Sequence, residues 1–364
     1  MLKREEKASH LLLGKELQGG WKVTKKYDRS EIQTGGIYSC CYEVRRNITN
    51  IEEIGFLKAI DYSDADKATD DTTALIQNIT NAYQYEKTIL NICLNSGLNN
   101  IVRLVDHGGI NVEEAIRYPR VEYLILEHAD QGDIRNVLNT TNVDFEWKIR
   151  SIHQVAKALS QLHKIGIAHQ DVKPSNVVNF GKTRTKLTDL GSACSKMQIQ
   201  QNLPEHLDES YSGSFEYSPP ELLYGYISGS WEQRRILCDL YLLGNMIIFY
   251  FLDVSMNSLL KSNLDRKLTW ERQDMYGNFE YAKPYLTEAF EKSLQDFKDA
   301  IDFKEVAEDL EMVVRFLCNP NPEKRGHSIN LDQKHNQYGL ARFLTIFDRI
   351  ARKYKYRTIN GTTI

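Results

Sequence analysis

Two stretches of the sequence decide the fold: HQDVKPSN at residues 169–176 and DLG at residues 189–191. Apolar residues with helical spacing, 145–165, precede the first stretch, and the strand-like residues 186–188 precede the second. Any one of these polar residues alone would be interpreted as a cap or a solvated side chain. The ordered combination of histidine, aspartate, lysine, proline and asparagine, with a second aspartate downstream, instead predicts a chemical site on two neighbouring loops.

The residue types in the two stretches suit the binding of a magnesium-bound phosphate. Asn176 and Asp189 supply oxygen ligands, and Mg²⁺ takes a few protein oxygens together with phosphate oxygens and water. Asp171 can accept a proton or orient a hydroxyl, and Lys173 offers a positive charge to a phosphate.

Both stretches resemble loops of the eukaryotic-type (Hanks-type) serine/threonine protein kinase family, whose patterns are H-R-D-L-K-x-x-N and D-F-G. The resemblance implies transfer of the γ-phosphoryl group of ATP to Ser or Thr hydroxyls of protein substrates. It implies that Asp171 and Lys173 are catalytic, and that Asn176 and Asp189 hold Mg²⁺, with Mn²⁺ as an alternative ion. The lysine two residues after Asp171 matches the serine/threonine-specific pattern rather than the tyrosine-specific one.

Two residues in the first half match the family's phosphate-binding lysine and its acidic partner. Lys58 stands in the apolar run 54–60, where the resemblance implies that it holds the α- and β-phosphates. Glu86, in the following helix, matches the catalytic-site glutamate that tethers this lysine. The alternative for Lys58 is a lysine that snorkels from an edge strand.

The glycine-rich loop of the family, G-x-G-x-x-G-x-V, is matched only in part. Thr34, Gly36 and Ser39 fall at the three glycine positions, with Gly35 beside them, and Cys41 falls at the valine position. By itself this stretch predicts a tight hairpin. The resemblance implies that Gly35, Gly36, Ser39 and Cys41 line the nucleotide, and the departure from the pattern weakens the expected affinity without changing the expected fold.

The resemblance also places the adenine-binding segment at residues 124–129. Leu126 falls at the gatekeeper position, and the backbones of Glu127 and Ala129 are expected to bind the adenine edge. Asp133 falls where the family often has an acidic residue near the ribose. The alternative for Asp133 is a helix N-cap, and the two roles are compatible.

Three features of the second half extend the resemblance. GSFEYSPPE at residues 213–221 resembles the family's G-T-x-x-Y-x-A-P-E segment, and Asp239 matches the start of its buried helix. Arg325 matches the arginine that pairs with the glutamate of A-P-E, here Glu221. Such a buried pair would be structural rather than catalytic.

Gln170 replaces the arginine of H-R-D. In the family that arginine can bind a phosphate on the activation segment, and glutamine cannot make this charge-assisted contact. We therefore hypothesise that the chain does not need the usual activation-segment phosphate. Leu190 replaces the phenylalanine of D-F-G, which exchanges one apolar residue for another.

The order of the expected elements predicts strands first and helices later. Strands are expected in a hairpin over 21–44 and at 54–60, 101–105 and 121–127, and helices at 82–94, 145–165, 240–252, 305–317 and 340–353. This order indicates an α+β fold with segregated lobes, the two-lobed protein-kinase-like fold that the resemblance implies. The expected domains are a catalytic domain over 20–330, with an N-lobe at 20–128 and a C-lobe at 129–330, and a C-terminal helical extension at 331–364.

Composition and charge narrow the range of functions. The 364 residues are 41% hydrophobic, enough for a sizeable core, and the net charge of −3 excludes a general electrostatic nucleic-acid binder. Six scattered cysteines contain no C-x-x-C pair, which argues against a zinc site or thioredoxin-like motif and favours a reducing, cytoplasmic location. No apolar stretch is long enough for a predicted transmembrane segment, since the run 240–252 has only 13 residues.

Two other functions compete with an active protein kinase. A pseudokinase would keep the fold as a scaffold or nucleotide-binding regulator, and the incomplete glycine-rich loop favours it. A small-molecule kinase is disfavoured, because such relatives usually lack the P-P-E segment and its distant arginine. The acidic insert 61–73 is expected to be a solvated loop rather than a partner site, and the basic helix near the C-terminus is expected to pack on the C-lobe rather than on an anionic partner.

Overall fold

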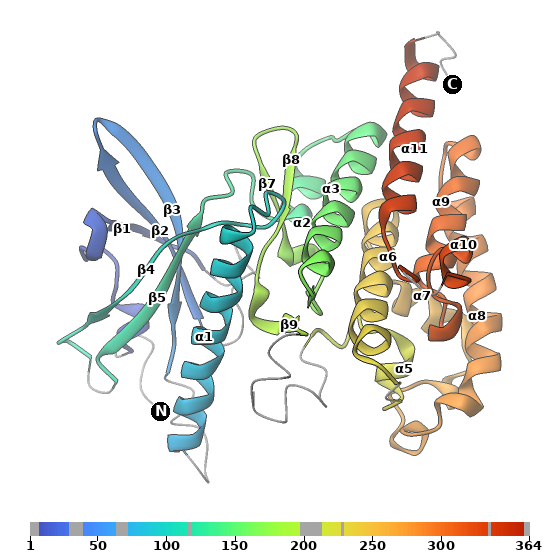
Figure 1. Ribbon diagram of the computed structural model, residues 1–364, viewed down its shortest axis with the longest axis horizontal. Helices are drawn as coiled ribbons and strands as arrows, with labels where there is room; N and C mark the ends of the chain where they lie inside the picture. Colours follow the sequence, from blue (N-terminus) through green and yellow to red (C-terminus); the bar gives the residue numbers. More distant parts are fainter. Residues whose placement is uncertain are drawn as a thin grey trace. The chain divides into compact units, whose positions relative to one another are not determined.

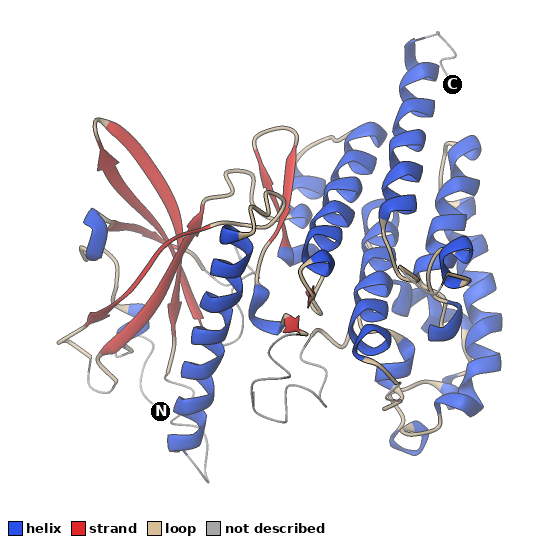
Figure 2. Ribbon diagram, viewed as in Figure 1, coloured by secondary structure: helices blue, strands red, loops and turns tan. Residues whose placement is uncertain are grey.

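The computed structural model describes residues 7–28, 39–62, 72–115, 118–196, 213–226, 229–333 and 336–359. The chain forms two compact units. The first contains Met1–Ile134, Val178–Lys182 and Lys186–Gly191, and the second contains Arg135–Val177, Thr183–Thr185 and Ser192–Ile364. Strands dominate the first unit and helices the second (Figure 2), as the α+β order predicted. The expected lobe and domain boundaries at residues 129 and 330 stay predictions.

A five-stranded antiparallel sheet builds the first unit, with strand order β1-β2-β3-β5-β4 (Figure 1). Its strands are β1 (Lys22–Lys26), β2 (Ser39–Ile48), β3 (Ile51–Ile60), β4 (Leu104–Asn111) and β5 (Arg120–Glu127). The turn between β2 and β3 places Thr49 and Asn50 at φ 48° and 66°, the positive values that tight hairpin turns require. Strand β3 is central, which positions Lys58 inside the unit rather than on an edge.

Two elements of the first unit differ from the sequence-based expectation. Helix α1 (Thr72–Asn95) begins ten residues earlier than the expected helix 82–94, so the last two residues of the acidic insert are helical. Residues 63–71 of the insert lie outside the described residues. Strand β4 begins at Leu104 and continues through Gly108 and Gly109 to Asn111, beyond the expected strand at 101–105. Pairing with β5 over this whole length explains the second difference, because the ladder satisfies the backbone of both glycines.

The N-terminal segment belongs to the core of the first unit. Leu12, Leu17 and Trp21 are buried in one cluster with residues of β2, β3 and β5. The Trp21 indole Nε1 donates a hydrogen bond to Asp106 Oδ2 at 3.0 Å, so the buried ring also satisfies its polar atom. Burying each leucine contributes about 1.5–3 kcal/mol. The folded unit therefore includes residues that precede the expected catalytic domain.

Helices build most of the second unit. They are α2 (Ile134–Thr140), α3 (Phe145–Lys164), α5 (Pro220–Leu223), α6 (Leu237–Leu252), α7 (Met256–Asn263), α8 (Phe279–Asp299), α9 (Lys304–Leu317), α10 (Ser328–Leu331) and α11 (Ala341–Ile359). A short strand pair, β6 (Ile167–Ala168) with β9 (Cys194–Ser195), also lies in the second unit. A further pair, β7 (Val177–Phe180) with β8 (Arg184–Leu187), has most of its residues in the first unit. The helical residues Glu232–Leu252, which include α6, are long and apolar enough to span a membrane by length and composition. Inside the protein, 89% of an apolar 18-residue stretch within them is buried.

The C-terminal helix α11 packs on α3 and α9 within the second unit (Figure 1). Phe347 and Ile350 are fully buried on its apolar face. On its basic face, Arg349 and Lys353 both pair with Asp309 of α9, at 2.9 and 2.5 Å. The helix thus packs on the second unit as expected, and two of its basic side chains form ion pairs within that unit.

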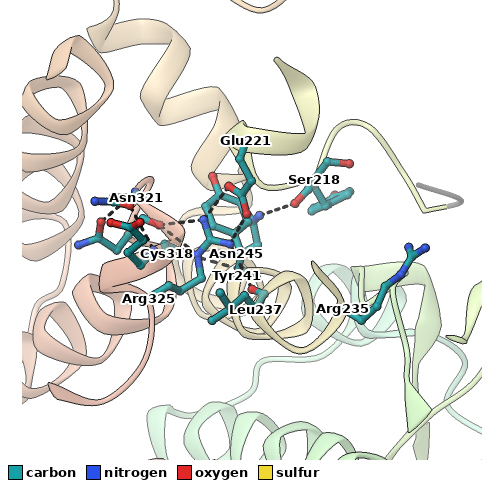
Figure 3. A network of polar contacts seen from close by, with 12 residues as sticks. Ser218, Glu221, Arg235, Leu237, Tyr241, Asn245, Cys318, Asn321 and Arg325 are labelled. Carbon is teal, nitrogen blue, oxygen red and sulfur yellow. Dashed lines mark hydrogen bonds and ion pairs between the residues drawn. The ribbon is translucent and has the colours of Figure 1, made fainter. Parts of the chain in front are cut away.

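A buried ion pair joins two distant segments of the second unit (Figure 3). Arg325 is fully buried, and its Nη1 and Nη2 donate to the two carboxylate oxygens of Glu221 at 2.6 and 2.8 Å. The remaining donors of Arg325 reach the carbonyl oxygens of Asn319 and Leu237. Its guanidinium also lies 5.0 Å from the ring centre of Tyr241. Burial alone would lower the pKa of Arg325, but Glu221 outweighs it and raises this pKa, so the arginine keeps its charge.

We expect Arg325→Met to lower the free energy of unfolding by about 3–5 kcal/mol, because Glu221 would remain as an unpaired buried charge. Urea unfolding followed by circular dichroism measures this loss. The matched control is Arg315→Met, which removes a partly exposed pair to Glu291 and Glu311 and should cost about 0–1 kcal/mol. Equal losses for the two variants would contradict the structural role of the buried pair.

Candidate functional site

The first unit brings one lysine and two carboxylates together. Lys58 of β3 is buried, and its Nζ donates to both oxygens of Glu86, at 2.9 and 2.8 Å. The same Nζ lies 2.9 Å from Asp189 Oδ1. Helix α1 supplies Glu86, and Asp189 follows β8 at φ 61°, a left-handed conformation that is strained for a residue with a side chain. The expected pairing of Lys58 with Glu86 is present, and Asp189 joins it.

The net charge of this cluster favours the binding of a cation. Burial alone would lower the pKa of Lys58, but Asp189 and Glu86 raise it above its usual value, so the amine stays protonated. Burial raises the pKa of Glu86, while the Lys58 ammonium opposes this rise. One ammonium thus faces two carboxyl groups, which leaves a negative excess when both are ionised. A bound cation would balance that excess.

Strand β2 carries two predicted nucleotide-binding residues, of which one is paired with Lys58. Cys41 is buried and pairs with Lys58 in the β2–β3 register. Burial is the main cause that raises the pKa of the Cys41 thiol to about 12. Ser39 begins β2, and its buried hydroxyl has no hydrogen-bond partner among the described residues. An orphaned buried hydroxyl fits a position that contacts a ligand. Gly35 and Gly36 lie outside the described residues.

The segment that follows β5 carries the other predicted nucleotide-binding residues. Leu126 is buried within the sheet, and Glu127 ends β5. The Glu127 N–H donates to the Arg103 carbonyl oxygen at 3.0 Å, so a contact of the Glu127 backbone with adenine would use its carbonyl oxygen. The Ala129 carbonyl accepts the N–H of Gly132 at 3.1 Å. Asp133 precedes α2 and forms an antiparallel bridge with Val178.

In the second unit, polar side chains converge on Asp171. Its Oδ2 accepts hydrogen bonds from Lys173 Nζ at 2.8 Å and Asn176 Nδ2 at 3.0 Å, and its Oδ1 accepts the Ser214 N–H at 3.0 Å. Asn176 is fully buried, and its Nδ2 also donates to the Asp171 carbonyl at 2.8 Å. The three residues of HQDVKPSN that were assigned chemical roles are therefore in mutual contact.

The buried Asp239 at the start of α6 anchors this loop. Its carboxylate accepts the backbone N–H groups of His169 and Gln170, each at 2.8 Å, and His163 Nε2 lies 2.8 Å away. Gln170 adopts φ 67°, which turns its N–H toward Asp239. Backbone donors of this kind are what a buried carboxylate requires. Sequence reasoning matched Asp239 only to the start of a helix and did not find its contacts with the loop.

Each unit holds one of the oxygen donors that the resemblance assigned to Mg²⁺. In the second unit, the NH₂ group of Asn176 donates to Asp171, and its carbonyl oxygen accepts a hydrogen bond from Ser175 Oγ at 3.4 Å. In the first unit, Asp189 supplies a carboxylate, one oxygen of which contacts Lys58. Both donor types fit Mg²⁺, which takes a few protein oxygens together with phosphate oxygens and water. That Asn176 and Asp189 hold one ion stays a prediction.

A family model described as "Protein kinase domain" matches residues 34–334. The chain belongs to the protein kinase family. This match covers both units of the kinase, including the Lys58 cluster and the Asp171 loop, and it agrees with the two-lobed fold predicted from the sequence.

The curated relatives of the kinase are named as kinases, and several of them as serine/threonine-protein kinases. Extracellular signal-regulated kinase 2 of Dictyostelium discoideum is 30% identical over 196 residues, which are 50% of this chain and 51% of the relative. Testis-specific serine/threonine-protein kinase 4 of Homo sapiens is 30% identical over 36% of this chain and 45% of the relative. Serine/threonine-protein kinase greatwall of Xenopus laevis is 38% identical over 22% of this chain and 9% of the relative. The kinase thus spans about half or less of these relatives.

We expect Cys41 of the kinase to resist alkylation at pH 7. With a pKa of about 12, its thiol is ionised in roughly one molecule in 10⁵ at that pH, and the rate should rise with pH until about 12. Peptide mapping after iodoacetamide treatment measures the labelling at each cysteine. Cys194, which is half-buried, serves as the internal comparison. Equal labelling of Cys41 and Cys194 at pH 7 would contradict this prediction.

Proposed function

We propose that this kinase transfers the γ-phosphoryl group of ATP, in the presence of Mg²⁺, to Ser or Thr hydroxyls of protein substrates. The observation that carries the proposal is the ion cluster in which Lys58 contacts both Glu86 and Asp189. A lysine held in this way can bind phosphate oxygens as a fixed charge, and phosphoryl transfer depends mainly on positioning and electrostatics. Protein substrates and ATP are accordingly the partners proposed for the chain.

The residues of the Asp171 loop suit the transfer of the phosphoryl group to the substrate hydroxyl. Asp171 would orient the substrate hydroxyl and accept its proton as the new oxygen–phosphorus bond forms and the bond to ADP breaks. Lys173, at 2.8 Å from Asp171 Oδ2, would stabilise charge on the transferred group. Mg²⁺, when bound, neutralises charge on the phosphate oxygens. Lys173 two residues after Asp171 supports Ser/Thr rather than Tyr as the acceptor.

We expect Lys58→Met and Asp171→Ala each to reduce phosphorylation by at least about 10²-fold, because each removes a group used in the transition state. Transfer of radiolabel from ATP to the chain itself or to a generic basic protein, with phosphosite mapping, measures the activity and the acceptor residue. Lys22→Met and Asp332→Ala remove exposed charges and are the controls.

The main alternative is a pseudokinase, which the incomplete glycine-rich loop favours. It predicts that the wild type and Asp171→Ala are equally silent with Mg²⁺ or Mn²⁺ while nucleotide still binds. That result would overturn catalysis and leave nucleotide binding in place. Label found on tyrosine alone would instead overturn only the acceptor specificity.

The contacts of Gln170 support the hypothesis that no activation-segment phosphate is needed. Its Nε2 donates to the Arg235 carbonyl at 2.8 Å and to Asp239 Oδ1 at 3.1 Å, and Arg235 Nη1 lies 3.4 Å from its Oε1. Gln170 is fully buried. The side chain that replaces the family's phosphate-binding arginine therefore fastens the loop to α6 and to the residues before it.

We expect phosphatase-treated kinase to keep most of its activity, because these internal contacts already fix the loop. Treated and mock-treated protein should be compared in the same radiolabel assay, with mass spectrometry to verify removal of phosphate. Complete loss of activity that returns when residues 189–221 are rephosphorylated would refute the hypothesis.

A cytoplasmic location stays a prediction and is part of this proposal. The six cysteines are thiols rather than disulfides, and five of them are buried. Buried thiols of this kind are compatible with a reducing compartment.

A further inference from the structure

Three side chains with metal-binding atoms meet in the first unit, away from the Lys58 cluster. They are His10 of the short N-terminal turn Ala8–His10, Cys40 of β2, and Asp61, which directly follows β3. One nitrogen, one sulfur and one oxygen from these residues all lie within 4.8 Å of one another. Cys40 and Asp61 are 8% and 6% exposed, and His10 is half-buried. The convergence thus lies largely inside the protein.

The donor types and their spacing suit zinc. Thiolate, imidazole and carboxylate are the three ligand types of protein-bound Zn²⁺, whereas Mg²⁺ and Ca²⁺ prefer oxygen alone. His10 Nε2 lies 3.5 Å from Asp61 Oδ2. Two ligands about 2.0 Å from a tetrahedral zinc ion are separated by about 3.3 Å, so these two atoms already lie near the required spacing.

We propose that His10, Cys40 and Asp61 bind a Zn²⁺ ion, with water as the fourth ligand. On binding, the Cys40 thiol releases its proton to solvent, and His10 coordinates as neutral imidazole. The absence of a C-x-x-C pair argued against a zinc site, but that spacing rule concerns ligands that are close in sequence. Here the three ligands come from segments about 30 and 20 residues apart, which β2 and β3 bring together.

The site would fasten the N-terminal segment to the sheet next to Lys58. Cys40 pairs with Ala59 in the β2–β3 register, one step from the pair Cys41 and Lys58. Around the site, Ser9 Oγ lies 3.7 Å from Cys40 Sγ, and the Tyr42 hydroxyl donates to the Ser9 carbonyl at 2.6 Å. Without metal, the contact between His10 and Asp61 and the hydrogen bonds of Ser9 still connect the N-terminal segment to the sheet.

Lys26 is expected to weaken zinc binding, which gives the proposal a second test. Its Nζ lies 3.0 Å from His10 Nδ1 and 3.3 Å from the His10 carbonyl. A zinc-bound histidine normally donates its second N–H to an acceptor, which an ammonium group cannot be. Lys26 must therefore turn away when zinc binds, and its charge weakens the affinity.

The test uses the full chain in excess Mg²⁺, titrated with Co²⁺ as a spectroscopic substitute for zinc and then with Zn²⁺ against a competing chelator. We expect one ion per chain and a thiolate-to-cobalt absorption band. Cys40→Ser and His10→Ala should abolish the band, while Cys93→Ser, which removes a buried cysteine of α1, should keep it. Absence of the band in the wild type overturns the proposal, whatever the variants do.

Lys26→Gln should tighten zinc binding by about 10-fold or more, because glutamine removes the charge and its carbonyl can accept the His10 N–H. Unchanged affinity in Lys26→Gln, or a band that survives Cys40→Ser in folded protein, would contradict the proposed ligand set. In either case the three side chains would form only a hydrogen-bonded contact of the N-terminal segment.

Discussion

The buried carboxylate of Asp239 is the constraint on which the catalytic loop depends. A charge that is fully buried must collect hydrogen bonds, and Asp239 collects them from the backbone of His169 and Gln170. To offer both N–H groups to one carboxylate, the chain turns through a positive φ at Gln170. This turn presents the next residue, Asp171, to Lys173 and its other partners. The strain of the turn, about 1–3 kcal/mol, is offset by the bonds to Asp239.

An opposite arrangement governs the first unit, where a buried ammonium collects carboxylates. Lys58 keeps its charge because Glu86 and Asp189 outweigh the effect of burial on its pKa. Removing any member of such a group leaves the others unbalanced in a medium of low polarity. The same imbalance makes the group responsive to added charge, such as phosphate or a metal ion. Each unit thus contains one preformed charged cluster.

The sequence was sufficient where chemistry needs a fixed order of residue types. It predicted Lys58 with Glu86, the Asp171 loop and the pair of Glu221 with Arg325, because these residues carry recognisable motifs. It did not predict contacts that arise only when distant segments pack, such as those of Asp239 with the loop or of Trp21 with Asp106. Helix α1 also begins earlier than expected, and its first turns carry apolar residues at helical spacing, Leu75, Ile76 and Ile79, that were not assigned to the helix.

The division of the chain into units has a consequence for synthesis on the ribosome. The first unit takes up Lys186–Gly191 only after residues 135–177 of the second unit have been made. Until then the emerging sheet holds Lys58 and Glu86 without Asp189. Completion of the first unit is therefore a late, long-range event, with a sequence separation of 131 residues between Lys58 and Asp189. Contacts of such separation slow folding, so a chain halted between the two units would carry the lysine before its full set of partners exists.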